Sequence, residues 1–258
     1  MEKQIVLFKD LGLIDYQPAW DYQEKLFQQN VGIKSVLRNR ELVNSNMASP
    51  EETDGVVAKY ALVPNPATQH YFLLCEHPPV ITLGKSGHAE NILISDTEMV
   101  QKGIQYFKTN RGGDITFHGP QQIVGYPIID LEKFYTDIGK YLRSLEEVII
   151  LTLLEYGLTA GRSKGETGVW LDAGKLGSER KICAMGVRCS RWITMHGFAF
   201  NVNTDLSYFD TIIPCGIQNK KVTSLQKELN RLIDYEEAKN KVKVNFEKVF
   251  GVQLQLMK

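Results

Sequence analysis

The chain of 258 residues is 43% hydrophobic and 10% aromatic, so it can bury a core of its own without disulfides or structural metals. Its 30 basic residues balance 30 acidic ones, and the net charge of zero excludes a strong overall attraction to nucleic acid or to anionic membranes. No run approaches the roughly 18 apolar residues of a membrane span, and no signal-peptide cleavage site occurs. We therefore expect a cytoplasmic protein.

The first part of the chain predicts one long helix among short strands. A strand near 5–8 precedes a helix that Pro18 opens and that runs to about Leu37. The polar run 38–55 breaks this pattern and is expected to be a surface excursion. Further strands are expected at 71–75, 80–83 and 104–107.

The second part mixes hairpins with helices. After a strand at 123–129, Thr136 or Asp137 caps the longest helix, which ends near Gly157. Strands are expected at 169–171, 181–188 and 193–202, the first two joined by a hairpin turn at 172–180, and helices near 223–232 and 235–250. The last helix has the capping-box pair Asp234 and Glu237. This order favours an α+β fold, a mixed sheet flanked by helices, in one domain spanning 1–258.

The stretch RGGDITFHGP, Arg111–Pro120, concentrates glycines, a charge and a histidine. It could be a ligand cradle, in which Gly112 and Gly113 admit a ligand close to the backbone while Arg111 and His118 supply polar groups at the rim. It could equally be a tight turn between strands, with His118 bonded to a backbone carbonyl. A nucleotide-binding loop is excluded, because neither GxxxxGK[ST] nor GxGxxG before a helix occurs.

Lys181 and Cys215 form a second candidate site. Cys215 stands in the sequence PCG, which suits a turn that exposes its thiol. A nucleophilic cysteine needs a base or a cation nearby, and His118, His196 and Lys181 are the candidates. Lys181 begins the apolar strand KICAMGV, where its ammonium is either partly desolvated or extends past the strand end into water.

Small residues interrupt two predicted strands, at Ala184-Met185-Gly186 and at Gly197-Phe198-Ala199. Glycine weakens a strand, so it often marks the close approach of a ligand or of another backbone. A β-bulge is the alternative at both places.

The remaining cysteines are expected to be buried as small apolar groups. Cys75, Cys183 and Cys189 lie in apolar strand-like runs. No CxxC pair and no histidines at zinc spacing accompany them. The sequence therefore predicts no metal site.

The motifs together resemble a known family. The run RGGDITFHGPQQIVGY, residues 111–126, is similar to the signature of lipoyl(octanoyl) transferases. Three further segments match in the family's order: CEHPPVITLGKSGHAEN, KICAMGVRCSRWITMHGFAFNVN and DLSYFDTIIPCGI. The resemblance covers about 7–224 and implies the fold of the biotin and lipoate protein ligase catalytic domain.

The resemblance also implies roles for the candidate residues. Cys215 would be the nucleophile, and Lys181, 34 residues earlier, would be its base. The acyl pocket would be formed by Arg111, Gly112, Gly113, Asp114, Ile115, Thr116, Phe117 and His118, by Ala184, Met185 and Gly186, and by Gly197, Phe198 and Ala199. His118 would lie towards the thioester end, whereas Arg111 would either contact the ligand or brace the loop.

The implied reaction moves an octanoyl group from acyl carrier protein to Cys215 and then to the lysine of a lipoyl domain. The implied acceptors are the lipoyl domains of 2-oxoacid dehydrogenase E2 subunits and the glycine cleavage H protein. Because the donor is already a thioester, neither ATP nor a cofactor is implied. Two alternatives remain: an ATP-dependent lipoate or biotin ligase on the same fold, and a non-catalytic module that binds lipoyl domains.

Four basic residues are candidates for docking these partner proteins, which are typically acidic: Arg162, Lys164, Arg188 and Arg191. An ordinary solvated surface is the alternative, because exposed charges contribute little to binding by themselves.

Overall fold

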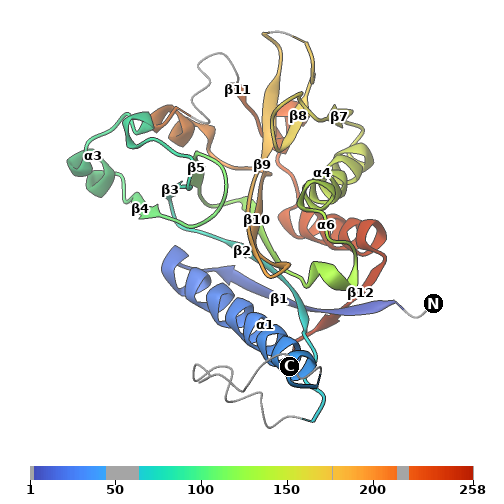
Figure 1. Ribbon diagram of the computed structural model, residues 1–258. Helices are drawn as coiled ribbons and strands as arrows, with labels where there is room; N and C mark the ends of the chain where they lie inside the picture. The colour runs from blue at the N-terminus through green and yellow to red at the C-terminus, as the bar shows by residue number, and fades with distance from the viewer. Residues whose placement is uncertain (1–2, 45–63, 176, 214–220, 258) are drawn as a thin grey trace.

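A large mixed sheet crosses the molecule, and a smaller sheet lies beside it (Figure 1). The computed structural model describes residues 3–44, 64–175, 177–213 and 221–257. The large sheet has the strand order β12 (Val252–Leu256), β1 (Gln4–Leu13), β2 (His70–Glu76), β6 (Gln122–Ile128), β10 (Ile193–Asn201), β9 (Arg180–Ser190), β8 (Val169–Leu171) and β7 (Ala160–Gly161), with β11 (Lys221–Val222) paired to β9. β1 runs parallel to both neighbours, whereas the pairs from β2 to β7 are antiparallel. The predicted α+β fold is confirmed.

Helices cover both faces of the large sheet. α1 (Tyr16–Asn44) packs against β10 and β6, and α4 (Ile138–Glu155) and α6 (Tyr235–Phe250) pack against each other on the other face (Figure 1). Alternate residues of β2 enter the two apolar clusters: Phe72 lies in the cluster with α4 and α6, and Leu73 in the cluster with α1. The run HYFLLCE is apolar almost throughout because both of its faces are covered.

The smaller sheet has its own core. β3 (Val80–Leu83) lies between β4 (Gln105–Lys108), to which it is parallel, and β5 (Ile115–His118), to which it is antiparallel. Its apolar cluster includes residues of α3 (Asp96–Gln101) and of the 3₁₀ helix η3 (Leu206–Thr211), and the 3₁₀ helix η1 (Ala89–Asn91) leads into α3. This sheet therefore forms a separate wall opposite β9 and β10.

Side-chain caps set the starts of the helices. The Asp137 carboxylate accepts from the Lys140 amide at the start of α4, and the Asp234 carboxylate accepts from the Glu237 amide at the start of α6. α6 ends at Gly251, whose φ of 66° suits the left-handed C-cap. Ser224 caps the short α5 (Leu225–Leu229), and Asp130 caps the 3₁₀ helix η2 (Leu131–Lys133). These caps confirm the predicted starts of α4 and α6.

The helix capped by Asp137 is not the longest, because α4 has 18 residues and α1 has 29. Two further expectations about local structure are wrong. α1 begins at Tyr16 and continues to Asn44, so 38–44 is helical and not part of an excursion. Pro18 is tolerated because the missing N–H is one that the first turn leaves without an intrahelical partner, and the run RNRELVN has neither glycine nor proline to stop the helix. Residues 45–55 of the predicted excursion lie outside the described part of the chain.

The second correction concerns the glycine-rich stretch, which is not a continuous loop. Ile115–His118 forms strand β5, paired to β3 along its whole length. The alternation of ITFH was hidden by the glycines on both sides of it. The sequence pattern did not predict α3 or β12. The helix expected near 223–232 is shorter than predicted and spans only Leu225–Leu229.

Candidate active site

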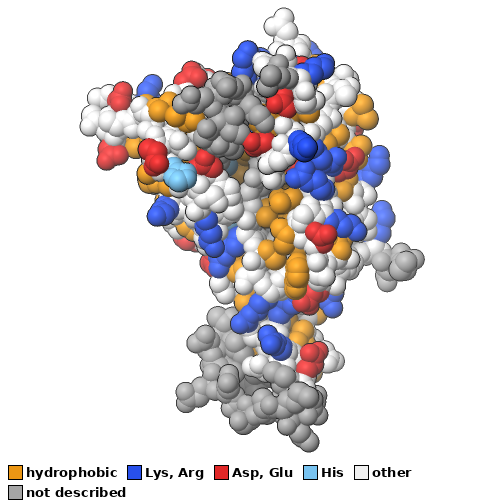
Figure 2. Space-filling model, turned by 45° about the horizontal axis from the view of Figure 1, so that its top comes forward, with side chains coloured by type: hydrophobic (Ala, Val, Ile, Leu, Met, Phe, Trp, Pro, Cys, Tyr) orange, Lys and Arg blue, Asp and Glu red, His pale blue; other side chains and the backbone are white. Residues whose placement is uncertain are grey.

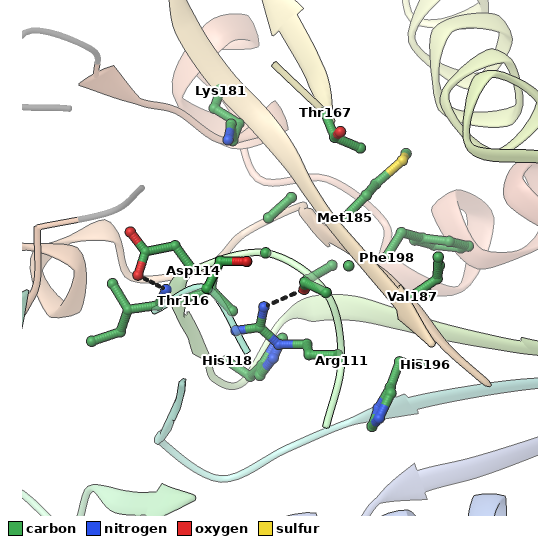
Figure 3. Close-up of a pocket in the computed structure, with 18 of the residues that line it drawn as sticks. Arg111, Asp114, Thr116, His118, Thr167, Lys181, Met185, Val187, His196 and Phe198 are labelled. Carbon is green, nitrogen blue, oxygen red and sulfur yellow. Dashed lines mark hydrogen bonds between the residues drawn. The ribbon is translucent and has the colours of Figure 1, made fainter. Parts of the chain in front are cut away.

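A cavity of about 860 Å³ lies between the smaller sheet and strands β9 and β10 (Figure 3). Its lining comes from the loop 111–114, from β5, β6, β9 and β10, and from the loop 165–167 before β8. This volume falls within the roughly 300–1,000 Å³ that small-molecule sites occupy. The cavity thus has room for a medium-length acyl chain and its reacting group.

Nearly all the site residues expected from the sequence border this cavity. Those that line it are Arg111, Gly112, Gly113, Asp114, Ile115, Thr116, His118, Lys181, Ala184, Met185, Gly186, Gly197, Phe198 and Ala199. Phe117 lies elsewhere: it is fully buried in the smaller sheet's core, stacked on Tyr208 at 4.8 Å between ring centroids. Strand alternation explains the difference, because Phe117 points to the opposite side of β5 from Thr116 and His118. Cys215 lies outside the described residues.

Arg111 braces the loop. Its guanidinium donates to the Thr82 carbonyl (2.7 Å) and hydroxyl (3.0 Å) and to the Gly112 carbonyl (3.1 Å; Figure 3). Gly113 has a φ of 86°, which only glycine adopts without strain, and the Gly112 amide donates to the Val187 carbonyl of β9 at 2.8 Å. The loop is therefore fixed to both sheets.

Gly186 of β9 and Gly197 of β10 allow a neighbouring segment of backbone to pass close to each strand. A Cβ on Gly186 would lie 2.6 Å from the Gly112 carbonyl oxygen and 3.2 Å from the Arg111 guanidinium. A Cβ on Gly197 would collide with the backbone of Gly125 in β6. Both glycines line the cavity, but the space that a side chain would take is already filled by the neighbouring chain. Of the two interpretations of these positions, close backbone approach is the one found.

Asp114 is held by its own loop. One carboxylate oxygen accepts from the Ile115 amide at 2.7 Å, and the other accepts from the Asn91 amide side chain at 3.3 Å. The carbonyl of Asp114 accepts from the Gly84 amide at 3.1 Å. These bonds join the loop to the segment around η1, which also borders the cavity.

His118 is buried in the wall of the cavity, and not at its rim. Its Nδ1 bonds Gln122 Oε1 at 2.9 Å, and its ring lies parallel to that of Tyr16 at 6.1 Å. Burial lowers the pKa of His118 to about 3, and the charges of His77 and Arg111 act in the same direction. The ring is therefore neutral at physiological pH.

His196 is a second buried neutral imidazole. Its φ of 60° turns the backbone so that its amide donates to Gln23 of α1, at 3.2 Å. The ring bonds Asn110 Oδ1 at 2.7 Å, and burial lowers its pKa to about 3, with Arg111 and Arg188 contributing. The ladder between β10 and β6 begins only beyond this kink, at Phe198.

Lys181 lies on β9 where two short strands meet it. Its Nζ is 4.6 Å from the centre of the Trp170 ring, and its carbonyl accepts from the Thr223 amide at 2.9 Å. Gly168, at a φ of 122°, passes so close that a Cβ there would lie 2.5 Å from the Cys183 carbonyl and 3.6 Å from the Lys181 stem. The lysine is half-buried, so it neither extends freely into water nor lies in the core.

The described cysteines differ in their burial. Cys75 and Cys183 are buried as predicted, whereas Cys189 is only half-buried. Burial raises the pKa of all three thiols. None of them lines the cavity, and none has the depressed pKa of an activated nucleophile.

The basic residues expected to form a docking patch do not all lie together. Arg162 pairs with Glu146 and Glu147 near α4, and Arg188 pairs with Glu24 of α1 at 2.8 Å. Arg162 directly follows Gly161 of β7, which pairs with Trp170 of β8, and Trp170 pairs with Lys181 of β9. Arg188 stands seven residues beyond Lys181 on β9, which corresponds to about 23 Å along the strand. Arg162 and Arg188 are thus far apart and already matched with carboxylates.

Several residues that line the cavity were not predicted from the sequence. Gln122 and Tyr126 lie within the signature but received no role, and Asn201 ends the second glycine-bearing strand. Tyr16 arrives from the first turn of α1, nearly one hundred residues before the signature, and no local signal connects it with the cavity.

Comparisons with known proteins identify the relatives of this chain. Residues 58–247 match the family model described as the lipoyl protein ligase A/B catalytic domain. A protein from Christiangramia forsetii named octanoyltransferase is 54% identical over 256 residues, covering 99% of both chains. A protein of the same name from Flavobacterium johnsoniae is 54% identical over 255 residues, covering 98% of this chain and 100% of its own.

The chain belongs to the lipoyl protein ligase A/B catalytic-domain family, among the octanoyltransferases. As a member of the octanoyltransferases it is an acyltransferase. Solved structures agree on the fold: a bi-partite lipoate protein ligase from Thermoplasma acidophilum has a TM-score of 0.62 at 14% identity, covering 100% of this chain and 88% of that one. Lipoate-protein ligase A bound with ATP gives 0.62 at 13% identity, covering 100% and 90%.

No group of histidine, cysteine or carboxylate side chains in the described part of the chain is arranged to hold a metal ion. Among the same residues, no helix is both long enough and apolar enough to cross a membrane.

Acid should destabilise the fold through its buried histidines. Burial lowers the pKa of His70 and His77 to about 4 and that of His118 and His196 to about 3, against 6.5 in the unfolded chain. The unfolded chain therefore binds more protons below pH 6.5, so stability is complete above that pH and falls as the pH drops. Between pH 7.5 and 5.5 each ring should cost about 1 kcal/mol, measured by urea unfolding. Equal unfolding free energies at the two pH values would refute the neutral, buried state of these rings.

Proposed function

We propose that this acyltransferase moves an octanoyl group from acyl carrier protein to the lysine of lipoyl domains, through a thioester on Cys215. It would act in the cytoplasm as one catalytic domain spanning 1–258. The name and the 54% identity of full-length relatives support octanoyl transfer. The acceptors would be lipoyl domains of 2-oxoacid dehydrogenase E2 subunits and the glycine cleavage H protein.

The position of Lys181 is the observation that carries the proposal. It borders the cavity, and its two partners in the sheet are Trp170 of β8 and Val222 of β11. β11 begins at Lys221, directly after the segment 214–220 that contains Cys215. A base on β9 and a nucleophile in that segment would therefore approach the cavity from adjoining parts of the chain.

The described residue before that segment also lies close to the cavity. The Ile213 amide donates to the carbonyl of Asn91 at 2.8 Å, and Asn91 lines the cavity. Cys215 follows Ile213 by two residues, so the covalent chain limits how far the thiol can be from this side. This supports Cys215 in preference to Cys75 and Cys183, which are enclosed in apolar clusters.

In the first half-reaction, the Cys215 sulfur attacks the carbonyl carbon of the octanoyl thioester while Lys181, in its amine form, takes the thiol proton. The bond to the carrier's sulfur breaks, and that sulfur leaves as a thiol after receiving a proton. In the second half-reaction the amine of the acceptor lysine attacks the Cys215 thioester, and Lys181 removes the proton that the new amide nitrogen loses. The bond between the acyl carbon and the Cys215 sulfur breaks, and the sulfur takes up that proton to restore the thiol. An amide replaces a thioester, so the transfer runs without ATP.

The acyl chain would be held mainly by apolar burial. The cavity lining offers Ile115, Val124, Met185, Phe198 and Ala199. About six methylenes at ~0.8 kcal/mol each could contribute up to ~5 kcal/mol. Because the binding free energy rises by the same small amount for every buried methylene, medium acyl chains should bind more tightly than short ones. This effect alone sets no sharp limit on chain length.

Octanoyl-acyl carrier protein should leave a single octanoyl group on the protein, detectable by intact mass and removed by hydroxylamine. Cys215→Ala should abolish the adduct, because no other thiol is assigned to the reaction. Cys189→Ala is the matched control, since it removes a half-buried thiol outside the cavity and should leave the adduct intact. An adduct that persists in Cys215→Ala would contradict the proposal. Transfer from free octanoate plus ATP, with none from the carrier, would favour a ligase.

Lys181→Met should slow both half-reactions by roughly 100-fold or more, which is the usual range for loss of a general base. Methionine keeps an unbranched stem beside Trp170 and removes only the ammonium group. Lys175→Met, 71% exposed in the turn before β9, should keep the wild-type rate. Single-turnover rates measured with each substrate in turn test this, and an unchanged rate in Lys181→Met would remove Lys181 from the mechanism.

A further inference from the structure

A run of hydrogen bonds crosses the floor of the cavity from Arg111 to the strand of Lys181. Arg111 donates to the Thr82 hydroxyl at 3.0 Å, and that hydroxyl is 3.4 Å from His118 Nε2. His118 Nδ1 bonds Gln122 Oε1 at 2.9 Å, and Gln122 Nε2 donates to Asn201 Oδ1 at 2.8 Å.

The run continues from the side chains into the backbone of Thr223, directly after β11, and then into that of β9. Asn201 Nδ2 donates to the Thr223 carbonyl at 3.0 Å, and the Thr223 amide donates to the Lys181 carbonyl at 2.9 Å. The wall that carries His118 is thereby tied to the residue proposed as the base. Thr223 also follows, by three positions, the segment that contains Cys215.

The hydrogen bonds from Arg111 to the Thr223 carbonyl can all point the same way, with each side chain accepting from the one before it and donating to the next. A backbone carbonyl only accepts, so Asn201 turns its nitrogen to Thr223 and its oxygen to Gln122. Gln122 must then donate to Asn201, and it also donates to the Phe117 carbonyl at 3.2 Å, which leaves its oxygen for His118. His118 therefore carries its proton on Nδ1, and its Nε2 accepts from Thr82.

The run is enclosed by protein. The exposed fractions of Thr82, Gln122, Asn201 and Thr223 are 0%, 1%, 3% and 0%. With so little solvent, a lost donor leaves its partner unsatisfied, and the members of such a network depend on one another. β11 has only two residues, so the side-chain bond from Asn201 adds substantially to its attachment.

We infer that Gln122 and Asn201 are positioning residues for the acyl transfer: they hold the His118 ring in the cavity wall and keep β11 in register with Lys181. Neither needs to touch the reacting atoms. The inference deepens the proposed function and rests on its assignment of Lys181.

Asn201→Asp tests the link to β11, because the carboxylate keeps an acceptor for Gln122 but loses the donor to the Thr223 carbonyl. We expect kcat for octanoyl transfer to a lipoyl domain to fall about 100-fold, as displacement of a catalytic group by ~1 Å does. The KM for octanoyl-acyl carrier protein should change by less than about 3-fold, because the acyl contacts remain.

Asn203→Asp is the matched control. Asn203 stands two residues away and donates to the Ile233 carbonyl at 2.9 Å and to Gln121 at 2.8 Å, so it loses the same kind of bond outside the run. Its Tm should fall as for Asn201→Asp while its kcat stays within about 3-fold of wild type. An equal loss of kcat in the two variants, or none in Asn201→Asp, would overturn the inference.

Gln122→Glu tests whether the two residues act as a unit. The carboxylate still accepts from His118 but cannot donate to Asn201 or to the Phe117 carbonyl. A double variant with Asn201→Asp should lose no more activity than the more damaged single variant. Multiplicative losses would contradict one continuous run.

The ring of His118 provides a test that needs no activity and no variant. The ¹⁵N shifts of its two nitrogens in the wild-type protein should show the Nδ1–H tautomer at pH 7. An Nε2–H tautomer would overturn the inferred direction of the run. If the tautomer is as expected but the wild type transfers no octanoyl group, the proposed function fails while the network remains.

Discussion

The hydrogen bond from the Gly112 amide to the Val187 carbonyl joins the two sheets, and the cavity depends on that junction. It can form only because Gly186 has no side chain to collide with the Gly112 carbonyl. Arg111 completes the junction by reaching from the loop to the Thr82 carbonyl of β3. The cavity is consequently the space left between two sheets that are bound together at one glycine-rich crossing. Figure 2 shows one face of the molecule, on which basic and acidic side chains occur in several separate groups.

The floor of the cavity, below that junction, contains buried polar side chains and is not purely apolar. Each histidine there has lost its solvent, so it stays neutral and needs defined hydrogen-bond partners. His77 shares this condition, since it bonds the Ile14 carbonyl and the Tyr126 hydroxyl, both at 2.7 Å. Such a floor resists rearrangement, which suits the proposed transfer, because one base would serve two partner proteins in turn from a fixed position.

The sequence predicted those features that depend on neighbours along the chain. Asp137 and Asp234 cap helices where expected, and strands β8 to β10 form where strand-like apolar runs predicted them. It did not predict that His118 is buried, because the rings of Tyr16 and His77, which pack against it, come from other parts of the chain. Phe117 was expected in the pocket for the same reason: its side of β5 is decided by pairing with β3, and not by its neighbours in the signature.

In the proposed reaction, one enzyme-bound thioester links the donor to the acceptor. The most direct test isolates the octanoylated protein, free of acyl carrier protein, and mixes it with an unmodified lipoyl domain. We expect the octanoyl mass to leave the enzyme and to appear on the acceptor lysine in equal amount, without ATP and at a rate that depends on Lys181. An octanoyl group that stays on the enzyme, or that is released only as free octanoate, would contradict the account.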